Sequence, residues 1–199
     1  ISAHLIGLNS QVQRAIHLGF LLLLGFPLLA LLRHYSKPAQ LIAWGMGLLG
    51  VVIASYQWIE YVPLMMRAGD INGVDTIIGI LTIFAVFAAA WVVMGPALPV
   101  VAGIFLIYAL FGEYFPGAMQ TRGYSLEQVV EQMAFGTEGI YGTPLYVSAT
   151  YIFLFILFGS FLEKAGMIKL FTDVSLGLVG HKMGGAAKVA VVSSGLMGT

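Results

Sequence analysis

The sequence has no cysteine and very little charge. The lack of cysteine excludes disulfides and thiolate metal sites. Only 9% of the 199 residues are charged, whereas a soluble domain carries roughly 25%. A chain so poor in charge cannot cover its own surface in water. We therefore expect lipid to be the solvent for most of it.

The few charges do not favour one sign. Nine Lys and Arg residues balance nine Asp and Glu residues, and no basic run interrupts the chain. Because a neutral chain has no long-range field that attracts phosphates, we predict no nucleic-acid partner.

The residue types that build metal and catalytic centres are scattered. The histidines are His4, His17, His34 and His181. None of them has the i, i+4 spacing of a metal site on a helix. The glutamates at predicted helix ends also do not form an acid/base pair at matching depth, as a membrane-embedded hydrolase would need. We predict that the chain is not an enzyme and holds no organic cofactor.

Long apolar runs take up most of the chain. A bilayer core of ~30 Å needs about 20 residues of helix, and five segments reach or approach this length, at residues 16–32, 39–59, 77–94, 96–114 and 143–162. Residues 77–111 in one helix would be about 52 Å long, too long for one crossing. Gly95, Pro96 and Pro99 supply a break between two helices there. The sequence predicts an all-α, polytopic protein with about five spanning helices.

Residues 117–142 form the most polar segment of the chain. Ser125 followed three residues later by Gln128 is typical of a capping box, with Ser125 as the N-cap. Apolar residues then fall on one helix face, which predicts a short amphipathic helix at the membrane surface. After this segment, Thr143 is expected to cap the fifth span and Pro144 to occupy its first helical position.

The chain ends in a glycine-rich segment unlike a membrane span. Residues 186–199 are too short to cross, and Ser193 and Ser194 stand just before two glycines and a threonine. Such segments form re-entrant or broken helices. If the helix unwinds here, its hydroxyls and carbonyls suit a small cation, and half-helix amino termini suit an anion. Alternatively, the serines bond only to their own backbone or to a neighbouring helix.

The loop charges predict the orientation of the spans in the membrane. If five helices alternate, one side holds six basic residues, namely Arg33, Lys37, Lys164, Lys169, Lys182 and Lys188. The other side holds Arg14, Arg67 and Arg122, so the first side is expected to be cytoplasmic.

The ends of the sequence predict a fragment. The chain begins without Met and stops in mid-pattern at Thr199, without a signal peptide at its start. We expect a piece of a longer membrane protein.

Two stretches resemble a known family. They are GTEGIYGTPLYVSATYIFLFILFGSFLE at residues 136–163 and GGAAKVAVVSSGLMGT at residues 184–199. Both resemble fused permeases of tripartite ATP-independent periplasmic (TRAP) transporters of the TAXI-associated type, and QRAIH at residues 13–17 is similar as well. In that type a small, DctQ-like subunit of four helices precedes a large, DctM-like one.

The resemblance implies secondary transport across the inner membrane of a bacterium or archaeon. Residues 1–116 would be the DctQ-like scaffold, residues 117–142 a periplasmic connection, and residues 143–199 the start of the DctM-like transport region. A periplasmic TAXI-type binding protein would deliver an organic acid. A sodium or proton gradient would drive an elevator-type motion, and the remainder of the permease chain would complete the machine.

The resemblance also implies two sites. Binding-protein docking is expected near Arg122, Glu127, Glu131 and Glu138. Ion or substrate binding is expected at Ser193, Ser194, Gly198 and Thr199, with a coupling sodium at Gly198 and Thr199, which match the first two residues of the family's ion-coordinating turn. The alternative function is a non-transporting scaffold or anchor subunit of a larger complex. Its marker would be a cofactor ligand set inside the spans, such as paired histidines, and the sequence shows none.

Overall fold

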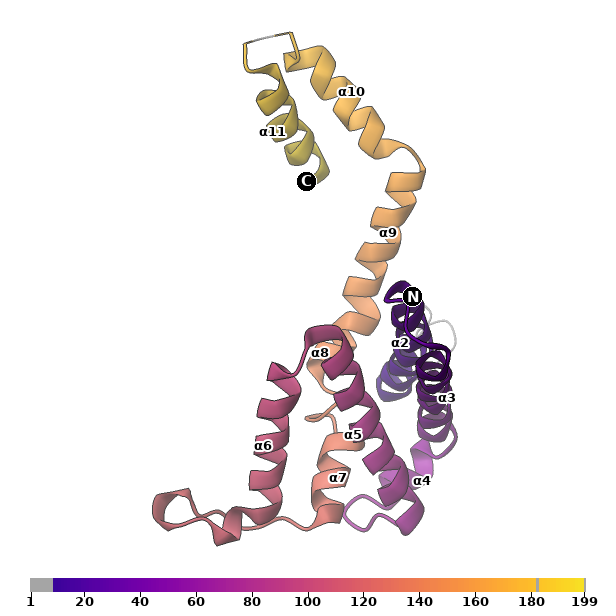
Figure 1. The fold of residues 1–199 in the computed structure, drawn as a ribbon, viewed down its shortest axis with the longest axis vertical. Coiled ribbons are helices and arrows are strands. Elements are labelled where there is room, and N and C mark those ends of the chain that lie inside the picture. Colours follow the sequence, from indigo (N-terminus) through magenta and orange to yellow (C-terminus); the bar gives the residue numbers. More distant parts are fainter. Residues whose placement is uncertain (1–8, 182, 199) are drawn as a thin grey trace. The chain divides into compact units, whose positions relative to one another are not determined.

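The computed structural model describes residues 9–181 and 183–198, and this part of the chain is helical without strands (Figure 1). Its described residues contain five helices long and apolar enough to cross a membrane. The predicted all-α, five-span architecture is thereby confirmed. Contacts divide the chain into two compact units, Ile1–Ala149 and Thr150–Thr199.

The spans follow the predicted segments closely. They are α2 (Ser10–Leu32), α3 (Lys37–Ile59), α5 (Gly73–Met94), α6 (Ala97–Phe111) with the 3-10 turn Gly112–Tyr114, and the fifth span Thr143–Lys164. Gly95 has a φ of 84° between α5 and α6, which confirms the predicted break. The fifth span begins after Gly142 as N-cap, not after Thr143 as expected, and no side chain caps it.

The fifth span is not one regular α-helix. It consists of α8 (Thr143–Val147), a π-helix (Ser148–Ile152) and α9 (Phe153–Lys164). A π-helix closes its hydrogen bonds from residue i to i+5, is rare, and is mostly found as a single turn inside an α-helix. Hydropathy gives no sign of it, so the sequence did not predict it.

Glycines let α2 and α3 approach each other closely. A Cβ on Gly50 would lie 2.6 Å from Leu22 Cβ, and one on Gly47 would lie 3.2 Å from the Leu23 backbone. A Cβ on Gly45 would meet nothing within 4 Å. Two of the three α3 glycines therefore face the packing surface, as expected for spans held together by van der Waals contact.

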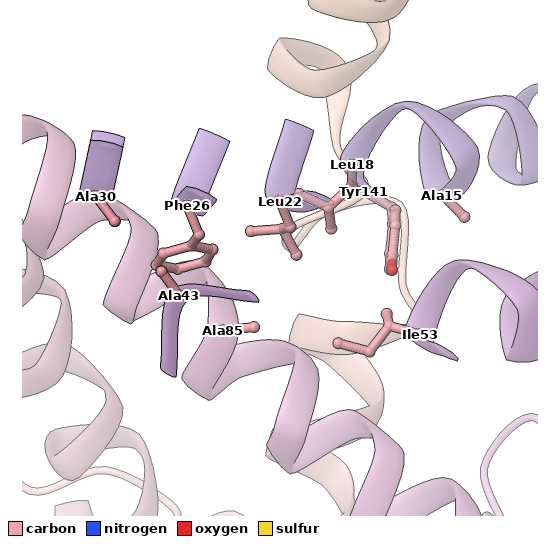
Figure 2. Packing of buried hydrophobic residues seen from close by; sticks show 9 residues of the cluster. All are labelled: Ala15, Leu18, Leu22, Phe26, Ala30, Ala43, Ile53, Ala85 and Tyr141. Carbon is pink, nitrogen blue, oxygen red and sulfur yellow. The ribbon is translucent and has the colours of Figure 1, made fainter. Parts of the chain in front are cut away.

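The core lies along one face of α2 (Figure 2). The buried residues of α2 in this cluster are Ala15, Leu18, Leu22, Phe26 and Ala30, spaced by three or four residues. They pack with Ala43 and Ile53 of α3, Ala85 of α5 and Tyr141. Most other large apolar side chains of the spans are exposed, as expected if they contact lipid.

A charge network around one buried carboxylate joins α3, α4 (Tyr61–Met66) and the start of α5. Asn72 and Asp75 form the capping box that begins α5. The Asp75 carboxylate is fully buried and accepts hydrogen bonds from the Tyr56 hydroxyl and, at 3.1 Å, from Arg67. Arg67 also donates to Glu60 at 3.3 Å. Burial alone would lower the pKa of Arg67, but its bonds to Asp75 and Glu60 raise that pKa overall, so the guanidinium stays charged.

The second unit contains a helical hairpin. α10 (Met167–Val179) and α11 (Gly185–Gly198) pack against each other. With 13 and 14 residues, each is about 20 Å long, short of a ~30 Å bilayer core. Unwinding was expected in the glycines and threonine after Ser194, and α11 is helical through Gly198, the last described residue. Small side chains next to a packed neighbour do not by themselves break a helix.

Candidate functional site

The polar segment contains the predicted short helix, α7 (Leu126–Ala134). Its capping box is confirmed: Ser125 Oγ accepts from Gln128 N at 3.2 Å, and Gln128 Oε1 accepts from Ser125 N at 3.1 Å. However, α7 does not lie freely on a membrane surface. It packs on α5, where Val130 is buried against Gly79. The absence of a side chain on Gly79 makes this close approach feasible.

A cavity of about 800 Å³ opens beside α7. Its walls come from α4, the end of α6, the segment before α7, and α7 itself. Of the predicted docking residues, Arg122 and Glu131 line it, whereas the exposed Glu127 and Glu138 do not. The structure therefore brings two of these four residues to one hollow.

The cavity is lined by polar groups of both kinds. Arg122 lies over the Tyr124 ring, 5.3 Å from its centroid, and Glu131 accepts a hydrogen bond from Gly69 N at 2.7 Å. Four glutamines also line it, namely Gln11, Gln57, Gln128 and Gln132. Amide side chains both donate and accept, but Gln11, Gln57 and Gln128 already bond within the chain, so Arg122, Glu131 and Gln132 are the main polar groups that the cavity offers.

Two of these glutamines hold the chain where α7 ends. Gln57 of α3, 1% exposed, donates from Nε2 to the Ala134 carbonyl at 3.0 Å. Gln11 of α2 donates to the Phe135 carbonyl at 2.6 Å. These carbonyls are the orphan acceptors at the end of a helix. Side chains distant in sequence therefore cap α7 and tie it to the spans.

The next residues are attached to α2 as well. Arg14 donates to the Tyr141 carbonyl, and its guanidinium lies 4.9 Å from the centroid of the Tyr146 ring. His17 Nε2 lies 3.1 Å from Ser148 Oγ. Tyr141 is fully buried, and burial raises the pKa of its hydroxyl, which stays protonated. Residues 134–148 are thus bonded to α2 and α3 at successive points.

We expect Gln57→Leu to destabilise the protein by about 1–3 kcal/mol, because the Ala134 carbonyl then stays buried without a donor. The measurement is thermal and denaturant unfolding of the full-length permease in mild detergent. Gln40→Leu is the matched control, since Gln40 donates to the Tyr35 carbonyl at 2.9 Å at an exposed position. Equal losses for the two variants would contradict the capping role.

The predicted ion-binding residues lie on α11. Ser193 is buried, and its Oγ is 3.5 Å from Thr172 Oγ on α10. Ser194 is exposed and donates to the Val191 carbonyl at 3.1 Å, which is the plain structural role that the sequence left open. Gly198 is the last residue of α11, and Thr199 lies outside the described residues.

The hydroxyl side chains of α10, the helix that packs on α11, were not predicted as part of this site. Thr172 and Ser175 both donate to carbonyls one turn earlier, at 2.8 and 2.7 Å, and Ser175 is fully buried. Their oxygens keep lone pairs for another partner. Within residues 9–181 and 183–198, no group of three or more histidine or acidic side chains is placed to hold a metal ion.

The family comparison decides the class of protein. The family described as the tripartite ATP-independent periplasmic transporter, DctM component, matches residues 81–199, more than half of the chain. The chain belongs to this family. The comparisons with curated proteins and with solved structures gave no match.

Membership in the DctM family makes this chain a TRAP permease component. The family is one of transporters rather than enzymes, and DctM components work with a periplasmic substrate-binding protein. Together with five candidate spans, this identifies a multi-pass membrane protein. The match begins within α5 and covers both the α7 region and the α10–α11 hairpin.

Proposed function

We propose that this DctM-family chain is part of a permease that imports an organic acid by secondary active transport. The family match over residues 81–199 carries the proposal, and the helical, lipid-facing fold supports it. A sodium or proton gradient drives uptake across the inner membrane of a bacterium or archaeon. The permease is of the fused, TAXI-associated type.

The division of labour follows an elevator scheme. Residues 1–116 act as a DctQ-like scaffold, residues 117–142 connect on the periplasmic side, and residues 143–199 begin the moving transport region. In support, the chain separates into two compact units, and the segment before the fifth span is bonded to α2 and α3 within the first.

The docking surface is proposed at Arg122, Glu127, Glu131 and Glu138. The cavity beside α7 supports this, because it offers Arg122 and Glu131 together with amide side chains. A TAXI-type binding protein would insert polar side chains there. Charged groups at the edge of a binding surface change the rate of association with the partner more than the final affinity.

Coupling-ion or substrate contact is proposed at Ser193, Ser194, Gly198 and Thr199, with sodium at Gly198 and Thr199. Its support is the hydroxyl pair where α10 packs on α11: the Oγ of buried Ser193 lies 3.5 Å from the Oγ1 of half-buried Thr172. Unwound backbone carbonyls coordinate Na⁺ in transporters with broken helices, and hydroxyl oxygens offer lone pairs of the same kind. α11 is helical through Gly198, so the oxygens that its described residues offer are side-chain hydroxyls.

The proposal is tested by uptake into proteoliposomes that contain the full-length permease. The probes are ¹⁴C-labelled mono- and dicarboxylates, each offered with the purified periplasmic binding protein. We expect accumulation only with the binding protein and with an inward sodium or proton gradient. Unchanged uptake after both are removed would overturn the proposal.

The same assay tests the docking surface with a matched charge reversal. Arg122→Glu is expected to raise the binding-protein concentration for half-maximal uptake by about three- to tenfold, because a rim charge steers encounter. Lys164→Glu makes the same change at an exposed site on the opposite predicted side and is expected to leave that concentration unchanged. Equal effects would remove Arg122 from the docking surface.

A further inference from the structure

A second cavity lies between three spans of the first unit. It measures about 300 Å³ and is lined by Phe26 and Ala30 of α2, Ala43 of α3, and Ala88 and Val92 of α5, among other apolar side chains. Figure 2 shows Phe26, Ala30 and Ala43 grouped at one end of the core. An empty space of this kind leaves its lining without dispersion contacts on one side. We refer to it as the apolar crevice.

The apolar crevice ends at the turn between α2 and α3. Tyr35 of that turn and Ala39 in the first turn of α3 are also part of its lining. Ala88 and Val92 lie near the end of α5, so the α5–α6 turn lies at the same end of the unit. The crevice therefore reaches from the interior of the spans toward one membrane surface.

The charge at this end of the unit has one sign. Arg33, His34 and Lys37 are exposed on the α2–α3 turn, on both sides of Tyr35. No acidic residue precedes Glu60 in the sequence, and residues 76–112 contain no charged residue at all. The helix ends around the crevice therefore carry basic groups without acidic partners of their own.

We propose that the apolar crevice holds one acyl chain of an anionic phospholipid, with the lipid phosphate bound at Arg33 and Lys37. An apolar slot beside a purely basic turn matches the two halves of such a lipid. Long basic side chains reach along apolar surface to a headgroup while their stems stay in the hydrocarbon. The loop charges place this turn at the cytoplasmic leaflet, which is the anionic one.

The lipid is favoured over a protein occupant by this charge complementarity. A further apolar helix of the permease, or a second copy of the chain, would fill the crevice but would give the charges of Arg33 and Lys37 no anionic partner; the Tyr35 hydroxyl, 3.4 Å from Arg33, is neutral. The proposal concerns a lipid site on the scaffold spans and stands independently of substrate, coupling ion and docking.

The test measures binding of dioleoylphosphatidylglycerol to the full-length permease by native mass spectrometry, with dioleoylphosphatidylcholine as the uncharged competitor. Wild type is expected to retain one phosphatidylglycerol in preference to phosphatidylcholine. Each basic residue near a membrane surface changes the affinity by about fivefold, so the double variant Arg33→Gln/Lys37→Gln should bind about 25-fold more weakly. Lys164→Gln/Lys169→Gln removes the same charge elsewhere and should retain the lipid.

A second variant tests the acyl-chain half. Ala43→Leu puts a larger side chain into the crevice while leaving the basic turn intact, and it should also release the lipid. Equal phosphatidylglycerol retention by wild type and both variants would overturn the proposal. So would a cysteine at Ala88 that stays closed to a lipid-soluble maleimide in delipidated protein, since a protein segment would then fill the crevice.

Discussion

Gly79→Val is expected to separate α7 from α5 and to lower the free energy of unfolding by about 2–3 kcal/mol. A Cβ at Gly79 would lie 2.2 Å from Cγ1 of Val130 and 3.2 Å from the Phe135 ring. Val130 is 1% exposed and β-branched, so it cannot turn away. The loss is measured by denaturant unfolding of the full-length permease.

Two further variants make this prediction specific. Gly45→Val makes the same change in α3, where a Cβ would meet nothing within 4 Å, and should cost less than about 0.5 kcal/mol. Val130→Ala added to Gly79→Val removes the clashing atom and should recover most of the loss. If Gly45→Val were as damaging, helix propensity rather than the α5–α7 contact would be the cause.

Asp75→Ala is expected to lower the free energy of unfolding by about 3 kcal/mol, more than the loss of any other charged residue. The loss is measured by denaturant unfolding of the full-length permease. It removes the acceptor for Tyr56 and Arg67 and the side chain that completes the capping box with Asn72. Asp75 is fully buried, so water cannot replace these bonds. Arg67 remains partly exposed, which keeps the loss below that of a fully buried pair.

Asp70→Ala is the matched control, because Asp70 is exposed five residues earlier and its removal should change stability by less than about 0.5 kcal/mol. A double-mutant cycle with Tyr56→Phe should give a coupling of about 1–2 kcal/mol to Asp75. Additive losses in that cycle would show that Tyr56 and Asp75 do not interact. An Asp75→Ala variant with an unchanged free energy of unfolding would show that the network does not stabilise the fold.

Local signals allowed most of the fold to be predicted. Long apolar runs located the five spans, Gly95 and the prolines after it located the turn between α5 and α6, and Ser125 with Gln128 located the start of α7. Each of these features depends on residues close together in sequence. The domain boundaries at residues 116 and 142 stay predictions; the compact units meet after Ala149, which neither tests nor replaces those boundaries.

The contacts between distant residues could not be predicted. Nothing in the sequence pairs Gln57 with Ala134, because 77 residues separate them. Arg14 entered the prediction as a loop charge and as part of QRAIH, without any sign of its partner Tyr141. At the other end of the chain, the hydroxyl and glycine content gave no sign that Ser193 on α11 lies 3.5 Å from Thr172 on α10.

The π-helix at Ser148–Ile152 changes how residues of the fifth span are placed on a helical wheel. An α-helix advances about 100° per residue, and closing the hydrogen bonds one residue later adds one residue to the local turn. A helical wheel that assigns about 100° to every residue therefore loses its register within Ser148–Ile152. Sites for spectroscopic labels inside this segment must be chosen from its own wider turn and not from an ideal α-helical wheel.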